Sequence, residues 1–131
     1  MLTESESRYL IVIYESYLNG VEDIGPKGLA DMMNVKRPTA YEMLSKLRGK
    51  GVVEKRGGRY FLTDKGVILA RRIIRNHRII ETLLYQAGVD LEKACRMAYR
   101  IQTELEDDVI DALCEYLGNP KKCPHGKPIP G

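Results

Sequence analysis

The 131-residue sequence contains no apolar run that approaches the roughly 20 residues needed for a membrane-spanning helix. Its opening stretch, MLTESESRYLIVIYE, is acidic, whereas a secretory signal peptide is basic at this end. The three cysteines follow no regular framework and cannot all pair within one chain. These absences argue against a membrane-spanning or exported protein, and we expect a cytoplasmic protein with reduced thiols.

The local signatures of common enzymes are also missing. The sequence has no glycine-rich phosphate loop, no nucleophile elbow and just two histidines. A chain of this length forms one compact unit or two small ones that share a core, which leaves little room for a multi-step active site. We therefore expect a binding protein and not an enzyme.

Positive charge is concentrated in the middle of the chain. Residues 26–78 carry a net charge of +10, while the segments before and after them carry −4 and −3. A basic segment between acidic flanks is typical of a nucleic-acid-binding face. A solvated basic surface without a partner has the same composition, so charge alone leaves both interpretations open.

The first third of the sequence predicts three helices. Thr3 and Glu6 have the spacing of a capping box, which starts a helix that ends at Asn19-Gly20. A short helix follows from about Pro26 and closes at Asn34. A third begins with Pro38 and stops at the glycines of RGKG. The predicted inward residues of the three helices are Leu10, Ile13, Tyr14 and Tyr17, then Leu29, Met32 and Met33, then Ala40, Met43, Leu44 and Leu47.

Two strand-like runs come next, GVVEKRG and GRYFLTD, joined by Gly57-Gly58, a dipeptide suited to a tight hairpin turn. Two short helices, a tight link and a basic hairpin in this order are the pattern of a winged helix-turn-helix. We expect this domain to occupy residues 1–63.

The second half predicts helices. With Asp64 as its N-cap, a long helix runs to about Ala87, and residues 91–117 form one or two more, before the Pro/Gly-rich coil NPKKCPHGKPIPG. The apolar positions of these helices are Val67, Ala70, Ile73, Ile74, His77, Ile80, Leu83 and Leu84, then Ala94, Ala98, Ile101, Leu105, Val109, Leu113 and Leu117. So few helices cannot bury all these faces within one subunit, so residues 64–131 are predicted to form a helical dimerisation domain. The expected fold class is mostly α with a small β-wing.

A helix-turn-helix places its second helix in the major groove of double-stranded DNA. Arg37 can pair with guanine, Thr39 can offer its hydroxyl or methyl group, and Pro38 can touch a thymine methyl. Basic residues farther out would neutralise phosphates. The predicted DNA contacts are Lys36, Arg37, Pro38, Thr39, Tyr41, Glu42, Lys46, Lys50, Lys55, Arg56 and Arg59.

The stretch ACRMAYRIQTELED, residues 94–107, places a cysteine, a methionine and a tyrosine on neighbouring faces of one predicted helix. Such a set is compatible with a metal site and with ordinary packing. The helical spacing does not decide between them.

The chain resembles the diphtheria toxin repressor family of metal-dependent repressors, which includes the manganese transport regulator. The resemblance is carried by ESRYLIVIYE, VKRPTAYEMLSKLRGKGVVE, GRYFLTDKG, NHRIIETLL and CPHGKPIPG. It implies a homodimer that binds a palindromic operator when iron(II) or manganese(II) is bound. Some members carry a third, barrel-like domain after the Pro-rich ending, so we expect either a two-domain form or part of a longer chain.

The primary metal site of the family is missing here. The matching positions, which in the family supply acidic, sulfur and imidazole ligands, are Arg8, Ile11, Tyr99, Gln102 and Thr103. These side chains cannot hold a divalent ion of this kind.

The second site of the family is retained in altered form, because His77 and Glu81 match its positions and Cys95 stands where the family has a histidine. The three would suit iron(II), manganese(II) or zinc at a non-standard site. The same residues are compatible with a His–Glu hydrogen bond beside a buried thiol, with no metal at all. For Cys123 and His125 we expect a structural turn, and for Cys114 a place in the core.

Three mechanisms therefore remain open from the sequence. In the first, metal binds only at the altered site. In the second, the dimer keeps its DNA-binding shape without metal, and Arg8 supplies a positive charge. In the third, another effector acts instead, such as a thiol-reactive signal or a small molecule. A module that binds DNA or protein without sequence preference is the alternative function.

Overall fold

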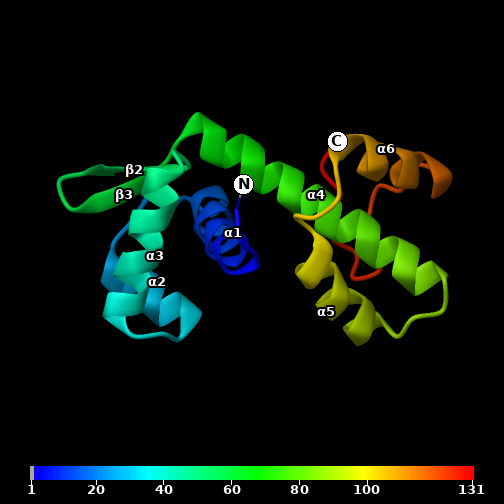
Figure 1. The fold of residues 1–131 in the computed structure, drawn as a ribbon, viewed down its shortest axis with the longest axis horizontal. Coiled ribbons are helices and arrows are strands. Elements are labelled where there is room, and N and C mark those ends of the chain that lie inside the picture. Colours follow the sequence, from blue (N-terminus) through cyan, green and yellow to red (C-terminus); the bar gives the residue numbers. More distant parts are fainter. Residues whose placement is uncertain (1) are drawn as a thin grey trace. The chain divides into compact units, whose positions relative to one another are not determined.

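The structure is a computed structural model that describes residues 2–131 (Figure 1). It has two compact units, of which the first ends at Ala70 and the second begins at Arg71. The elements in chain order are α1 (Glu4–Leu18), β1 (Asp23–Ile24), α2 (Pro26–Met33), α3 (Arg37–Gly49), β2 (Val53–Arg56), β3 (Arg59–Leu62), α4 (Asp64–Gln86), α5 (Leu91–Ile101) and α6 (Asp107–Tyr116). The mostly helical fold with a small β-wing is confirmed. Within residues 2–131, no helix is both long enough and apolar enough to cross a membrane.

The start of α1 is the predicted capping box. The Thr3 backbone N–H donates to Glu6 Oε1 at 2.8 Å, and the Glu6 N–H donates to Thr3 Oγ1 at 3.1 Å. Glu6 is buried and forms an ion pair with Lys50 at the end of α3. Burial by itself raises the pKa of Glu6, but the bonds from Lys50 and Thr3 outweigh it, so the pKa lies below its ordinary value.

The helix-turn-helix is formed by α2 and α3, which lie side by side in Figure 1. Asn34 ends α2 in the left-handed conformation, with φ of 54°, as predicted. The buried face of α3 consists of the four predicted residues, Ala40, Met43, Leu44 and Leu47. This packing holds the first turn of α3 at the surface.

The wing is the predicted hairpin of β2 and β3. Arg56 pairs with Arg59 across the turn, and Gly57 and Gly58 both have positive φ, 56° and 79°. A two-residue turn of this kind requires such φ values, which glycine adopts without strain. A third strand, β1, pairs antiparallel with β3 and was not predicted.

The N-cap of α4 differs from the prediction by one residue. Thr63, and not Asp64, caps the helix, because its Oγ1 accepts the Gly66 N–H at 3.0 Å. The same hydroxyl donates to the Gly51 carbonyl at 2.6 Å. The capping threonine thus also ties the helix to the loop before the wing.

Three residues predicted as buried are exposed, namely Tyr17, Met32 and Val109, at 42%, 47% and 39%. Each lies in a terminal turn of its helix, where the core no longer faces it. Tyr17 stacks on Tyr14, and in α6 it is Ile110 that occupies the core. A helical period predicts which face is apolar but not how far along the helix the core extends.

The second unit is built on the C-terminal half of α4, with α5 and α6 alongside it (Figure 1). Its core is Ile79, Ile80, Ala98 and Ile110. Cys114 packs against this cluster, as predicted. The C-terminal coil is held in place because Ile129 also packs there and Arg78 donates to the Pro128 carbonyl.

Candidate nucleic-acid interface and metal centre

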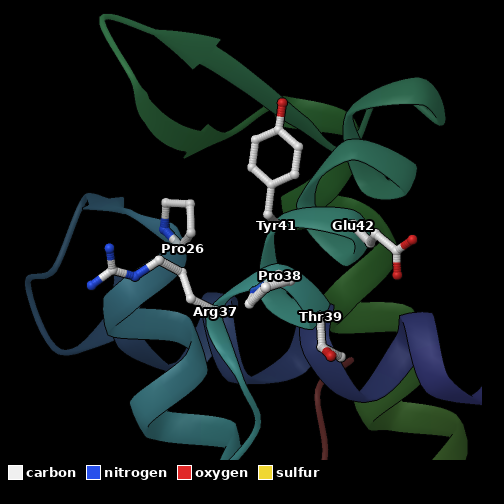
Figure 2. Close-up of a pocket in the computed structure, with 6 residues that line it drawn as sticks. All are labelled: Pro26, Arg37, Pro38, Thr39, Tyr41 and Glu42. Atoms are coloured by element: carbon white, nitrogen blue, oxygen red, sulfur yellow. The ribbon is translucent and has the colours of Figure 1, made fainter.

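The predicted DNA-contacting residues are exposed, except Lys50, which is half-buried. Five of them line one shallow concave surface together with Pro26, the first residue of α2 (Figure 2). Those five are Arg37, Pro38, Thr39, Tyr41 and Glu42. Sequence reasoning missed Pro26, because its place beside the start of α3 depends on how the two helices pack.

The N-terminal end of α3 is strongly positive. Lys36 is its N-cap residue, Arg37 begins the helix, and the first turn contains no acidic residue. The helix dipole adds partial positive charge at the same end. Within residues 2–131 the Arg37 guanidinium has no ion-pair or hydrogen-bond partner, and it is therefore available to an anion or a base edge.

The basic residues of the wing differ in how they are held. Lys55 Nζ lies over the rings of Tyr41 and Tyr60, 5.9 and 5.7 Å from their centroids. The Arg56 guanidinium stacks over Phe61 at 3.9 Å. These contacts order two cations that remain exposed to solvent.

Two of the predicted phosphate contacts form ion pairs with residues of other elements. Arg59 pairs with Asp23 at 2.9 Å, which joins β3 to β1, and Lys50 pairs with Glu6. Both therefore stabilise the DNA-binding unit itself. Their contact with DNA stays a prediction.

The three predicted metal ligands, His77, Glu81 and Cys95, lie together. One donor atom from each falls within 4.8 Å of the others. His77 Nε2 is 3.4 Å from Glu81 Oε2 and 3.7 Å from Cys95 Sγ. Adjacent turns of α4 supply the first two, and α5 supplies the third.

The imidazole of His77 is oriented by Gln102. His77 Nδ1 lies 3.1 Å from Gln102 Oε1, an atom that can only accept, so this contact favours the tautomer with the proton on Nδ1. Nε2 is then left as an acceptor that faces Glu81 Oε2. Gln102 is buried, and its backbone carbonyl accepts from Asn76 Nδ2 at 3.0 Å, which fixes the pair in place.

Cys123 and His125 lie on the other side of the same carboxylate. His125 Nδ1 is 3.0 Å from Glu81 Oε1, and Glu81, Cys123 and His125 form a second group of donor atoms within 4.8 Å of one another. The Gly126 N–H donates to the Cys123 carbonyl at 2.8 Å, so the segment is also the expected turn. Sequence reasoning gave these two residues no part in the site. CPHG is the only local signal that could have suggested one.

The cluster is centred on the buried carboxylate of Glu81. Glu81 is 1% exposed, and its Oε2 has no hydrogen-bond partner of good geometry among the described residues. Burial raises the pKa of Glu81, but His125 and the thiols of Cys95 and Cys123 outweigh it, so the pKa is lowered and the buried carboxylate stays ionised. A buried charge of this kind is costly unless it is paired.

Burial shifts the pKa values of His77 and Cys95 in the directions that favour their neutral forms. It lowers the pKa of His77, and the attraction of Glu81 offsets this only in part. Burial and the Glu81 carboxylate raise the pKa of the Cys95 thiol to about 11. Cys95 and His125 also line a surface hollow with Tyr99, so the cluster can be reached from solvent.

Two of the positions that the resemblance assigns to the primary metal site, Arg8 and Tyr99, have other contacts. Arg8 forms an ion pair with Glu4 at 2.9 Å, and the Tyr99 ring lies 4.3 Å from that of His77.

Two family models match the chain. The iron dependent repressor N-terminal DNA binding domain matches residues 1–59, and the iron dependent repressor metal binding and dimerisation domain matches residues 63–131. The iron-dependent repressor IdeR of Mycobacterium tuberculosis is 32% identical over 99% of this chain. The chain spans 57% of the length of that relative.

Solved structures agree with these matches. A hypothetical protein from Sulfolobus solfataricus has a TM-score of 0.85 at 32% identity, covering 99% of this chain and 100% of its own. The manganese regulator SloR has a TM-score of 0.81 at 33% identity, covering 96% of this chain and 59% of its own. The chain belongs to the iron-dependent repressor family, with the DNA-binding domain and the metal-binding and dimerisation domain that define it.

Proposed function

We propose that this chain is a metal-responsive transcriptional regulator that acts in the cytoplasm as a homodimer and represses genes by binding a palindromic operator. Residues 1–63 bind DNA, and residues 64–131 dimerise and bind the metal. The observation that carries the proposal is the pairing, in one chain, of an exposed basic helix-turn-helix with a buried carboxylate that faces two histidines and two thiols.

The residues at Glu81 fit a divalent transition metal. Oε2 is buried without a good hydrogen-bond partner, and His77 Nε2 faces it as a second acceptor. Two acceptors that face each other repel unless a proton or cation lies between them. Cys95, Cys123 and His125 would complete the set. When bound, the metal would link α4, α5 and the C-terminal segment.

The donor set favours some metals over others. IdeR is named for iron and SloR for manganese. Thiolates and imidazoles suit zinc and iron(II), whereas manganese(II) prefers oxygen ligands. We therefore propose that this chain binds zinc or iron(II) more tightly than manganese(II).

Metal binding can be measured directly by equilibrium dialysis of the reduced protein against zinc, iron(II) and manganese(II). The expected result is about one ion per chain, with manganese(II) the weakest. Cys95→Ser and Cys123→Ser should each lower the affinity. Cys114→Ser is the matched control, because Cys114 packs against the apolar core and should leave binding unchanged. Equal affinity in all three variants would refute the metal site.

DNA specificity can be measured by fluorescence anisotropy on promoter fragments at physiological salt. A specific regulator keeps an affinity for its operator that is about 10³-fold or more above that for random DNA. A module that binds by charge alone would show no such ratio and would lose most of its affinity as salt rises.

A further inference from the structure

Glu42 is an acidic side chain on a surface that otherwise attracts anions. It lies in the second turn of α3 and lines the same concave surface as Arg37 (Figure 2). The remaining charged residues of α3 are Arg37, Lys46 and Arg48. Figure 2 shows the Glu42 carboxylate pointing away from the helix, on the opposite side from the Arg37 guanidinium.

The carboxylate does not stabilise α3 through an ion pair. Lys46 stands one turn further along, at the spacing of a helical salt bridge, yet within residues 2–131 no ion pair or hydrogen bond joins Glu42 to any residue. Other acidic residues of the same unit are paired, as Glu54 with Arg56 at 3.4 Å and Glu6 with Lys50. Glu42 is therefore left with its full charge at the surface.

An unpaired carboxylate that faces DNA is repelled by the phosphates. It can offset this repulsion by accepting a hydrogen bond from a base. On the major-groove edges, cytosine N4 and adenine N6 are donors, whereas guanine and thymine present acceptors. The adenine donor stands beside the N7 acceptor, which repels a carboxylate, so cytosine is the best partner.

We propose that Glu42 is a specificity-determining residue that accepts a hydrogen bond from the amino group of a cytosine in each operator half-site. Pro38 and Thr39 precede it by four and three positions, so the three residues share one face of α3. The charge of Glu42 also discriminates against guanine and thymine at that position. This inference rests on the proposed function, since it requires sequence-specific binding of duplex DNA.

The test is a selection from duplexes with randomised half-sites. It compares the wild-type protein, Glu42→Ala and Glu42→Gln in parallel with zinc, iron(II), manganese(II) and chelator. The wild type should enrich cytosine at one position of each half-site. In Glu42→Ala the enrichment of cytosine at that position should fall by about 5- to 150-fold, the range for one good base contact. Glu42→Gln should move it towards adenine, which glutamine reads through N6 and N7.

Glu15→Ala is the control, because Glu15 is an exposed acid of α1 outside the predicted DNA contacts and should leave the selected sequence unchanged. Identical base frequencies for the wild type and Glu42→Ala would overturn this inference alone. Failure of the wild type to enrich any sequence under any metal condition would overturn the proposed function, and this inference with it. Glu42 is exposed, and circular dichroism spectra of the variants should match that of the wild type.

Discussion

Gly66 lies where the start of α4 meets the loop before the wing, and replacing it with alanine should destabilise the DNA-binding unit. A Cβ atom at this position would stand 2.1 Å from the Val52 carbonyl oxygen, whereas ordinary contacts begin near 3.4 Å. That oxygen accepts the Thr63 N–H at 3.2 Å, and the Val52 N–H donates to Leu47 at 3.2 Å. The backbone of Val52 is thus anchored on both sides and cannot move away freely.

The magnitude follows from three effects. Forcing extra volume into packed structure costs about 1–3 kcal/mol. Separating Val52 from Thr63 loses about 1 kcal/mol of hydrogen bonding. Alanine recovers up to about 1 kcal/mol through its higher helix propensity. The free energy of unfolding should therefore fall by about 2 kcal/mol, which for a chain of this size lowers Tm by about 8 °C.

Thermal unfolding followed by circular dichroism measures this change. Gly49→Ala is the control, because Gly49 is the last residue of α3 and a Cβ there would meet no atom within 4 Å. That variant should be as stable as the wild type or more stable by up to about 1 kcal/mol. Equal Tm values for Gly66→Ala and Gly49→Ala would refute the packing described at Val52.

Three further predictions concern charged residues. Glu6→Gln keeps the capping acceptor but loses the Lys50 ion pair, and urea unfolding should show a loss of about 1 kcal/mol at pH 7. Because folding lowers the pKa of Glu6 below 4.5, the wild type should stay more stable than Glu6→Gln above pH 4.5. This stability difference should vanish as the pH falls through the pKa of Glu6 in the folded protein. A stability difference that does not change with pH would contradict the role of the ion pair. Arg37→Ala should weaken operator binding by about 1–3 kcal/mol in anisotropy, and an equal loss on random DNA would refute base contact. Lys46→Ala should weaken binding to all sequences and lower the salt slope by about one unit, and an unchanged slope would exclude phosphate contact.

Features set by neighbouring residues could be predicted from the sequence. The capping box of Thr3 and Glu6, the left-handed Asn34 and the Gly57-Gly58 turn each depend on a few consecutive residues. The winged helix-turn-helix could be predicted from the order of two short helices, a tight link and a basic hairpin. The sequence does not distinguish Thr63 from Asp64 as the N-cap of α4, because both are good capping residues. In the structure the hydrogen bond from the Gly66 N–H to Thr63 Oγ1 distinguishes them.

Features that depend on distant segments could not be predicted. Strand β1 is two residues long and exists because it pairs with β3, far along the chain. The approach of Cys123 and His125 to Glu81 depends on the C-terminal coil folding back across α4. The role of Gln102 was also hidden, because its identity indicated a lost ligand while its position supports His77.

We propose that metal at the Glu81 cluster controls DNA binding. The most direct test is the operator affinity of the purified protein after complete chelation, and again with zinc, iron(II) or manganese(II) added back under reducing conditions. We expect the affinity to rise about tenfold or more with at least one metal, equivalent to about 1.4 kcal/mol of coupling. The His77→Ala, Cys95→Ser double variant should lose that rise. Chelated protein that binds the operator as tightly as metal-loaded protein would contradict it.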